Sequence, residues 1–510
     1  MNNKKRKKVP LLCIFFTFLS IVFAGIYIGG FVYNTFISNI ILLTGMVVLT
    51  AIAIWAVHLA ETATVKGWIK ISAVTAIIFL QVVFTVLFRT DNTWGWDFDT
   101  VVMLAKAYVN HTDMSYAYLA RCSNNILYFW LVVGIFQMSK LISGRTDVIL
   151  LLIFNVMILD ISVFLIYRIC AQWKNTKFAN MVTLMCFLFV PFWVYLPIAY
   201  TDIFSMPLYI LPVYLYTFYG KEEKTVKCWI TFFIMGLTGA VGLAFKGNTL
   251  IALVAISIFC FLNEKMKTAI PKIGIMCISF LTIYLLITSS YSHMSILGEH
   301  NIQDESVPIS HYIYMGMVGD GTWNADIFAE TMEYNTHDEK AEYIKQRIRE
   351  VAEDYGVWGL LKHIEYKESK IVWNDGMLKG DMYICREPRH QKAVWYIFQE
   401  SNFVSICIKT YSNIFWKMLL TLMLTGGMIR IRKNDARDPF TILYLILMGT
   451  ILFFAFWESN SRYLLNAVPF MIMMAADTLW SLYEYFMGKT VFCGNRNKKL
   501  RCIFREKVLL

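Results

Sequence analysis

The sequence predicts an all-α protein that crosses a membrane about twelve times, with one further membrane-embedded segment that does not cross and a mainly helical extracytoplasmic insert. Three observations predict this class. The chain of 510 residues is 57% hydrophobic, with a mean hydropathy of +0.53. Its apolar residues form runs of roughly 20, the length that a membrane-spanning helix needs. The polar insert shows no alternation of apolar and polar residues, so we expect little or no sheet.

Charge and cysteine usage narrow the function classes. Lys and Arg number 47 against 36 Asp and Glu, and they fall mainly in short segments between apolar runs and at both ends of the chain. That placement indicates membrane topology, not a nucleic-acid partner. The 11 cysteines are scattered and form no CxxC pair or Cys/His ligand spacing. We therefore expect neither a zinc site nor a disulfide framework.

The chain begins with a basic segment, and the apolar run that follows continues past Tyr33. This run is longer than the apolar region of a signal peptide, and no convincing cleavage pattern of small residues accompanies it. We therefore expect an uncleaved first span. Together with the second span it would form an N-terminal addition over residues 1–69.

Twelve apolar runs have roughly the length of a span. They lie at 10–33, 39–58, 70–88, 148–167, 178–198, 203–219, 228–245, 249–263, 273–290, 411–429, 439–457 and 464–486. These runs divide the chain into parts. After the N-terminal addition we expect a transmembrane core over 70–290 with its first outer loop at 89–147, an extracytoplasmic insert over 291–410, C-terminal spans over 411–486 and a basic cytoplasmic tail over 487–510.

A further apolar run at 125–142 decides the topology. If it crosses the membrane, the basic segments at 221–227, 263–272 and 430–437 cannot all be cytoplasmic together with the basic C-terminus. If it is embedded without crossing, all of them fall on the cytoplasmic side, and only two basic residues of the loop after the run break the rule. We therefore expect a multi-pass protein of a bacterial cytoplasmic membrane with both termini in the cytoplasm.

The same arrangement gathers the polar clusters that are not simply basic on the extracytoplasmic face. The first is WGWDFDT at 94–100, which carries Asp97 and Asp99 and is followed by YLARCSNN with Arg121. Ionisable groups at a membrane boundary are costly unless they are paired or functional, so we expect part of an active site there. The alternative is a solvated interfacial loop.

These residue types suit the transfer of a sugar from a lipid phosphate to a hydroxyl. A carboxylate can accept the proton of the acceptor, and cations can stabilise the departing phosphate. Asp97 and Asp99 point in different directions on a helix, so we expect a single base, with the other carboxylate capping a helix that starts near Thr100. Arg121 and Lys246 are candidate phosphate ligands, although Lys246 could equally snorkel at the end of a span.

Supporting residues are expected at three further positions. Asp202 would orient the partner groups of Asp97 or a divalent ion such as Mg²⁺ or Mn²⁺, or else cap the following helix. Glu458 and Arg462 would pair with each other or with groups across the cavity, and Arg462 would bind the donor phosphate or sugar hydroxyls. Alternatively, the two charges only pin a turn. His311 of the insert would either touch a substrate or be solvated. The remaining supporting candidates are Asn124, Asn125 and Tyr463.

Two other function classes share parts of this pattern. A transporter or flippase of a lipid-linked sugar would also have many spans and interfacial cations. Transporters often carry internal repeats or paired broken helices, however, and the sequence shows no such symmetry. A non-catalytic scaffold for envelope enzymes would give no reason for ionisable residues to gather on one face.

The segment WGWDFDTVVMLAKAY, followed by YLARCSNNILYF, resembles the first outer loop of GT-C class glycosyltransferases. The similar branch is a Gram-positive membrane group related to protein O-mannosyltransferases and aminoarabinose transferases. Further stretches resemble that branch, and together the similarity extends from about residue 90 to 470. They are PIAYTD at 197–202, PISHYIYMGMVGDGTWNADIF at 308–328, a W-x-D-G at 373–376 and ESNSRY at 458–463.

This resemblance implies an inverting transferase that uses a polyprenyl-phosphate-linked sugar outside the cytoplasmic membrane, with Asp97 as the catalytic carboxylate. The acceptor would be a glycopolymer, lipid or protein of the cell envelope. Two departures bear on metal dependence and on the acceptor site. Cys122 and Ser123 replace the Tyr-Pro of the branch, and Phe98 stands where many relatives carry Glu.

Overall fold

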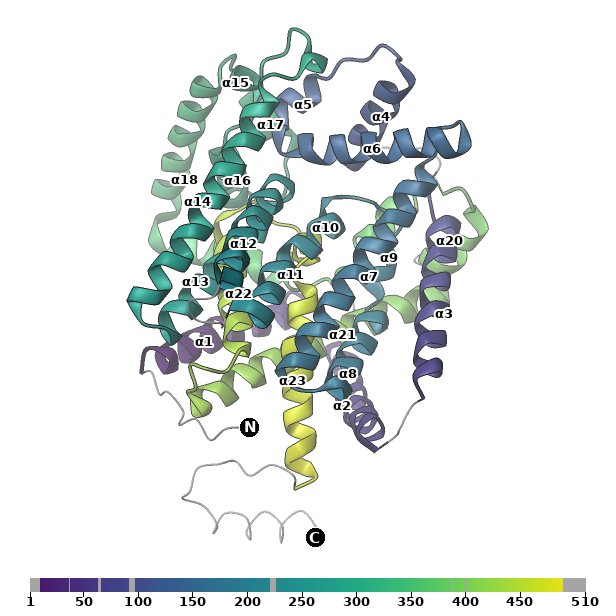
Figure 1. Ribbon diagram of the computed structural model, residues 1–510, viewed down its shortest axis with the longest axis vertical. Helices are drawn as coiled ribbons and strands as arrows, with labels where there is room; N and C mark the ends of the chain where they lie inside the picture. The colour runs from purple at the N-terminus through teal and green to yellow at the C-terminus, as the bar shows by residue number, and fades with distance from the viewer. Residues whose placement is uncertain are drawn as a thin grey trace.

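The computed structural model describes residues 10–35, 37–62, 66–90, 97–220, 226–386, 388–399 and 401–488. Within these ranges the chain is all-α, as the sequence predicts (Figure 1). The only β pairing in the described ranges is an isolated bridge between Thr90 and Pro388. The tryptophans of the WGW tract and the C-terminal tail after 488 lie outside the described residues.

The N-terminal helices are part of the main bundle. They are α1 (Pro10–Val32), α2 (Asn39–Thr62) and α3 (Gly67–Leu87). Both α1 and α2 pack against α21 (Phe403–Lys433), and α3 packs against α7 (Val148–Trp173). The buried hydrophobic residues of α1 and α2 belong to the same hydrophobic core as the C-terminal helices.

The first outer loop folds into short helices that lie against one end of the bundle. They are α4 (Asp97–Asn110), α5 (Ala117–Arg121), η1 (Ser123–Asn125) and α6 (Ile126–Ser143). Figure 1 shows α6 running across that end beside α4, whereas α3 and α23 run along the length of the molecule. α23 (Val468–Phe486) is the last described helix.

The central part of the chain supplies the middle of the bundle after α7. Its elements are α8 (Thr176–Leu188), α9 (Val190–Val194), α10 (Thr201–Phe204), α11 (Met206–Leu215), η2 (Tyr216–Gly220), α12 (Val226–Phe245), η3 (Gly247–Thr249), α13 (Leu250–Asn263) and α14 (Met266–Tyr291). α12 packs closely on α14 because Gly236 of α12 has no side chain. A Cβ there would lie 2.0 Å from the hydroxyl oxygen of Ser279.

The insert is also helical. Its elements are η4 (Ser295–Leu297), α15 (Ile302–Glu305), α16 (Ile309–Met317), α17 (Ala325–Met332), α18 (His337–Tyr366), η5 (Lys367–Val372), α19 (Gly380–Ile384) and α20 (Gln391–Phe398). The longest of these helices is α18, which starts at a capping box formed by Thr336 and Glu339. Ile344 of α18 is fully buried in a small core of its own, with Ile348 and Val351 packed against it.

After α21 the chain returns through α22 (Phe440–Phe456), η6 (Ser461–Leu464) and α23. Each of the twelve expected spans contains a helix. Eight described helices are long and apolar enough to cross a membrane, and the apolar helices α8, α13 and α22 are shorter. Short helices occur where a polar corner interrupts the apolar run, as η3 does immediately before α13.

The polar loops gather at two ends of the bundle. At one end the ammonium of Lys177 donates to the carbonyl oxygen of Glu61, and the amide of Asn263 donates to the carbonyl oxygen of Ala436 at 2.7 Å. At the other end lie the start of α4, η1, α10, η3 and η6. The loops that the charge pattern grouped on one side of the membrane therefore also touch one another in the fold.

α6 does not cross the bundle, although it is apolar enough to do so. It follows η1 at the end that carries the polar site, and its last turn stays beside α4, where Lys140 donates to the carbonyl oxygen of Val109 at 2.8 Å. α7 then starts at Val148 and runs 26 residues to the opposite end. The crossing is therefore made by α7, and both ends of α6 lie at the end of the bundle that carries the polar site.

The insert is anchored on the end of α22. Lys367 is fully buried, and its ammonium donates to the carbonyl oxygens of Gly316, Ala455 and Trp457 at 2.7, 3.1 and 3.1 Å. A Cβ on Gly316 would lie 2.6 Å from the carbonyl carbon of Trp457, so only glycine fits there. The insert therefore holds the corner that follows α22 in place.

Candidate functional site

The two carboxylates of the first outer loop face different surroundings. α4 starts at Asp97, so Asp97 and Asp99 both lie in its first turn, at the positive end of the helix dipole. The helix does not start near Thr100 as expected, and Asp99 is therefore not a cap preceding it. The Asp97 side chain is exposed, whereas Asp99 is buried and accepts a hydrogen bond from the Tyr383 hydroxyl.

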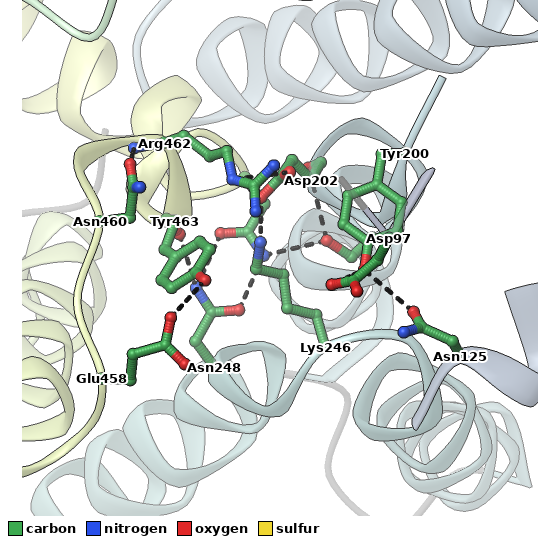
Figure 2. Close-up of polar contacts among 12 residues, drawn as sticks. Asp97, Asn125, Tyr200, Asp202, Lys246, Asn248, Glu458, Asn460, Arg462 and Tyr463 are labelled. Atoms are coloured by element: carbon green, nitrogen blue, oxygen red, sulfur yellow. Dashed lines mark hydrogen bonds and ion pairs between the residues drawn. The ribbon is translucent and has the colours of Figure 1, made fainter. Parts of the chain in front are cut away.

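Tyr200 connects Asp97 to the rest of the site. Its hydroxyl lies 3.2 Å from Oδ2 of Asp97 and 3.0 Å from Oδ1 of Asn125. The amide of Asn125 in turn donates to the Tyr118 hydroxyl at 2.8 Å. Figure 2 shows Asp97 and Asn125 together beside the Tyr200 ring. The start of α4, η1 and the corner before α10 therefore meet at one tyrosine.

A buried ion-pair cluster lies on the other side of Tyr200. Lys246, between α12 and η3, pairs with Oδ1 of Asp202, and Nε of Arg462 lies 3.9 Å from Oδ2 of the same carboxylate. The three side chains are only 15%, 5% and 10% exposed, so their charges act on one another with little screening by water. Lys246 lies 4.7 Å from the centre of the Tyr463 ring (Figure 2).

Arg462 is held between two aromatic rings. Its guanidinium carbon lies 5.6 Å from the ring centre of Tyr200 and 5.3 Å from that of Tyr463. The hydroxyl of Tyr463 donates to Glu458 at 2.8 Å. The expected pairing of Glu458 with Arg462 is therefore indirect, because the phenol of Tyr463 lies between them (Figure 2).

Burial sets the electrostatics of this cluster. It lowers the pKa of Lys246, and the neighbouring Asp202 opposes that change. Burial also raises the pKa of Glu458, which favours its neutral form. Lys246 and Arg462 both face the carboxylate of Asp202.

Buried amides hold the frame of the site. Asn248 and Asn466 donate to each other's side-chain oxygens at 3.0 and 2.9 Å, and Asn466 also donates to Ser205 at 3.1 Å. Asn155 of α7 donates to the carbonyl oxygen of Leu196 at 2.9 Å, in the turn that leads to α10. Sequence reasoning missed Ser205 and Asn466. Their signal is a polar residue inside an apolar run, which is too common in helices to identify a site.

The W-x-D-G stretch of the insert also reaches the site. The hydroxyl of Ser461 donates to Asp375 at 2.7 Å, and the other oxygen of Asp375 accepts the amide N–H of Met377 at 2.9 Å. Gly376 has φ +63°, a conformation that favours glycine. Asp375 thus ties the insert to η6, one residue before Arg462, a role that no single-sequence pattern assigned.

Three expected site residues lie elsewhere. Nε of Arg121 is 3.9 Å from Oε2 of Glu305 in α15, and its side chain is 46% exposed. Asn124 is exposed on η1. His311 is not solvated as a loop residue would be. It is fully buried in α16, its Nδ1 lies 2.8 Å from the Thr331 hydroxyl, and burial lowers its pKa to about 4.

No group of three or more His, Cys, Asp or Glu side chains among the described residues is arranged to hold a metal ion. Asp202, the carboxylate considered for Mg²⁺ or Mn²⁺, is instead paired with Lys246.

Fold and site together define an all-α polytopic membrane protein with a buried ion-pair cluster at one end of its bundle. The chain belongs to the family described as conserved hypothetical integral membrane protein, whose model matches residues 5–481. No curated protein matches the chain. The family description states no activity, so the function has to be argued from the residues.

Solved structures of the oligosaccharyltransferase AglB from Archaeoglobus fulgidus are distantly similar. The complex with an inhibitory peptide and dolichol-phosphate gives 11% identity and a TM-score of 0.42, over 87% of this chain and 55% of that chain. The complex with Zn and sulfate gives 9% and 0.42, over 80% and 50%. This chain thus spans about half the length of the archaeal protein.

Proposed function

We propose that this protein is a GT-C type glycosyltransferase. It would move a sugar from a polyprenyl-phosphate-linked donor to a hydroxyl of a cell-envelope acceptor outside the cytoplasmic membrane, with inversion at the anomeric carbon. The observation that carries the proposal is the convergence of an exposed carboxylate, Asp97, with two buried cations, Lys246 and Arg462. They come from three distant segments and meet through Tyr200 and Asp202.

The proposed reaction is a single displacement. The acceptor oxygen attacks the anomeric carbon while its proton passes to the carboxylate of Asp97. The bond between the anomeric carbon and the phosphate oxygen breaks, and its electron pair leaves on the polyprenyl phosphate. Lys246 and Arg462 stabilise the charge that develops there, in a site where burial strengthens their effect.

Asp97 suits the role of base better than Asp99. Its side chain is exposed to an incoming acceptor, and the Tyr200 hydroxyl fixes its direction. Asp99 is buried against Tyr383, where an acceptor hydroxyl has no access to it. In this proposal Asp99 supports the fold of α4, and only Asp97 touches the reacting atoms.

Asp202 holds Lys246 and Arg462 close together when no phosphate is bound, so the two cations are already placed to bind one. A donor phosphate could take the place of Asp202 as their partner without leaving either cation buried and unpaired. Arg462 presents a planar fork that matches phosphate oxygens, whereas Lys246 acts as a point charge. Arg121 is left out of this phosphate site, because it pairs with Glu305 on the insert.

The test is transfer by the purified protein reconstituted in liposomes with radiolabelled polyprenyl-phosphate sugars and an envelope extract as acceptor. Asp97→Asn keeps the size of the side chain and removes the base, so we expect transfer to fall by about 100-fold or more. Asp99→Asn is the matched control, since it makes the same change two residues away. It should lower stability more than it lowers the rate per folded protein.

Transfer that survives Asp97→Asn unchanged would sink the assignment of the base. If the wild-type protein moves the labelled lipid between leaflets and transfers no sugar to any acceptor, the protein is a flippase of a lipid-linked sugar and not a glycosyltransferase. The two results are separated by measuring leaflet distribution and acceptor labelling in the same liposomes.

A further inference from the structure

A cavity of about 660 Å³ lies between the C-terminal end of α4, the turn that follows it and the outward side of α6. Figure 1 shows α4 and α6 side by side at the end of the molecule that carries the candidate site. The residues discussed above as catalytic or phosphate-binding do not line this cavity. Its volume falls in the range of sites that hold small ligands.

The lining is rich in hydrogen-bonding side chains. Tyr108, Tyr116, His111 and Gln137 all line the cavity. His111 and Gln137 are exposed and the two tyrosines are half-buried, so a ligand can reach all four. Several donors and acceptors around aromatic rings are suited to hydroxyl-rich molecules.

The aromatic part of the lining is held rigidly. The rings of Tyr108 and Tyr116 both pack edge-on against Phe129 of α6, at centroid distances of 6.2 and 6.0 Å. Tyr108 also packs against Trp130 at 5.3 Å. Because one phenylalanine fixes both tyrosines, their hydroxyls are positioned before a ligand arrives, which lowers the entropic cost of binding.

The charge of the cavity favours a neutral ligand over an anionic one. Lys140 is its only lysine or arginine, and the ammonium of Lys140 already donates to the carbonyl oxygen of Val109. A phosphate or carboxylate site would normally offer further cations or a row of backbone N–H groups. A neutral polyhydroxyl ligand fits this lining better.

The cavity and the proposed base share one helix. Asp97 is the first residue of α4, and Tyr108 follows it eleven positions later, which places the two about 16 Å apart along the helix axis. One monosaccharide cannot reach both places. A chain of several sugar units can.

We propose that this cavity binds a neutral oligosaccharide segment whose other end lies at Asp97. The inference rests on the proposed glycosyltransferase function and adds to it that one of the two substrates is an extended glycan. The segment could belong to the acceptor or to the glycan carried by the donor lipid. In both cases the cavity would select for chain length.

The probe is an array of neutral and anionic oligosaccharides of one to six units, read with the full-length detergent-purified protein. We expect binding to neutral glycans that strengthens with chain length. The double variant Gln137→Leu with Tyr116→Phe removes two hydrogen-bonding groups without large changes in size, and should weaken binding by about tenfold. Gln346→Leu, at an exposed glutamine of α18, is the matched control.

Absence of saccharide binding, or equal binding by the wild type and the double variant, would overturn the inference. Competition by a polyprenyl-phosphate-linked oligosaccharide would assign the segment to the donor, and binding that this lipid leaves unchanged would assign it to the acceptor. Transfer activity without glycan binding would overturn the inference alone. Glycan binding without transfer activity would overturn the proposed function instead.

Discussion

Arg462 is the site residue whose surroundings most clearly require its own side chain. Its guanidinium lies between the rings of Tyr200 and Tyr463 and beside the carboxylate of Asp202. A flat, delocalised cation can use both rings and still present its fork to a phosphate. Lysine has the same charge, but its ammonium is not planar and cannot donate two parallel hydrogen bonds to a phosphate.

We therefore predict that Arg462→Lys keeps expression and membrane insertion near normal and weakens donor use by about tenfold or more, the effect of losing roughly one charge-assisted hydrogen bond. The measurement is the KM for the polyprenyl-phosphate sugar in liposomes. Arg145→Lys, at an exposed position after α6, is the control. Normal donor kinetics in well-expressed Arg462→Lys would reduce this corner to a structural turn.

At the scale of elements, hydrogen bonds and ring stacking join the insert to the corner at 458–463. Lys367 of η5 bonds to carbonyl oxygens of the insert and of α22, and the amide N–H of Glu458 donates to the carbonyl oxygen of Tyr312 at 2.9 Å. The ring of Tyr312 stacks on Trp457 with centroids 5.4 Å apart. The insert thus supports the backbone that carries Glu458 and Arg462.

Lys367→Met should loosen this corner, because it removes one donor from each of three carbonyl oxygens. The carbonyl oxygens of Gly316 and Trp457 keep a second partner, in His363 and Ser459 at 3.0 Å each, so the cost of about 1–3 kcal/mol for an unsatisfied buried group falls mainly on Ala455. Hydrogen exchange of the backbone at 455–463 should become faster, and donor use should fall with it. Lys370→Met, at an exposed lysine three residues on, should change neither. Wild-type exchange rates at 455–463 in Lys367→Met would show that the insert does not support the corner.

The insert should also lose stability in acid through His311. Burial lowers the pKa of His311 to about 4, whereas an unfolded histidine titrates near 6.5. Between these values the unfolded chain binds a proton that the folded insert does not, so stability falls as the pH drops from about 6.5 to 4, by an amount on the order of 3 kcal/mol. Above pH 6.5 this effect is absent.

Limited proteolysis of the insert at pH 7 and pH 5 measures this loss. His311→Gln keeps a polar group near Thr331 and removes the titration, so its proteolysis should depend less on pH than that of the wild type. His293→Gln, at an exposed histidine, should behave as the wild type. Equal pH dependence in all three proteins would remove His311 as the cause.

At the scale of the whole molecule, the two clusters of polar loops predict a topology. Asp320 belongs to the insert, and Lys265 lies in the loop between α13 and α14 at the opposite end of the bundle. Both side chains are exposed. If the basic loops are cytoplasmic, the insert and the candidate site lie outside the cell.

In a cysteine-free background, a cysteine placed at 320 should react with an impermeant thiol reagent in intact cells. A cysteine at 265 should react only after permeabilisation. The reverse pattern would move the site to the cytoplasm, where soluble nucleotide-sugar donors become plausible. A protein with native-like activity in the cysteine-free background is the control for correct insertion.

The sequence by itself determined the fold class of this protein and predicts its membrane topology. Spans are local features, since a run of about 20 apolar residues must be a helix in a membrane whatever surrounds it. The charges that flank each run add its orientation. This is why all twelve expected segments contain helices, and why the run at 125–142 could be predicted from charge alone not to cross.

The site was only partly accessible to the same reasoning. Asp97, Lys246 and Arg462 stand out because ionisable residues beside apolar runs are rare and costly. Their partners do not stand out. Nothing in the sequence links Lys246 with Asp202 or pairs Arg121 with Glu305, because these contacts join segments that only chain folding brings together.

The tertiary structure decided which of several similar residues face one another. It placed Asp97 at an exposed position and buried Asp99 against Tyr383 from the insert, although the two are separated by one residue. It also buried His311, which sequence reasoning placed in a loop. The physical reason is that periodicity and hydropathy determine what a residue does within its own helix, whereas a site is made by the packing of helices that are far apart in the chain.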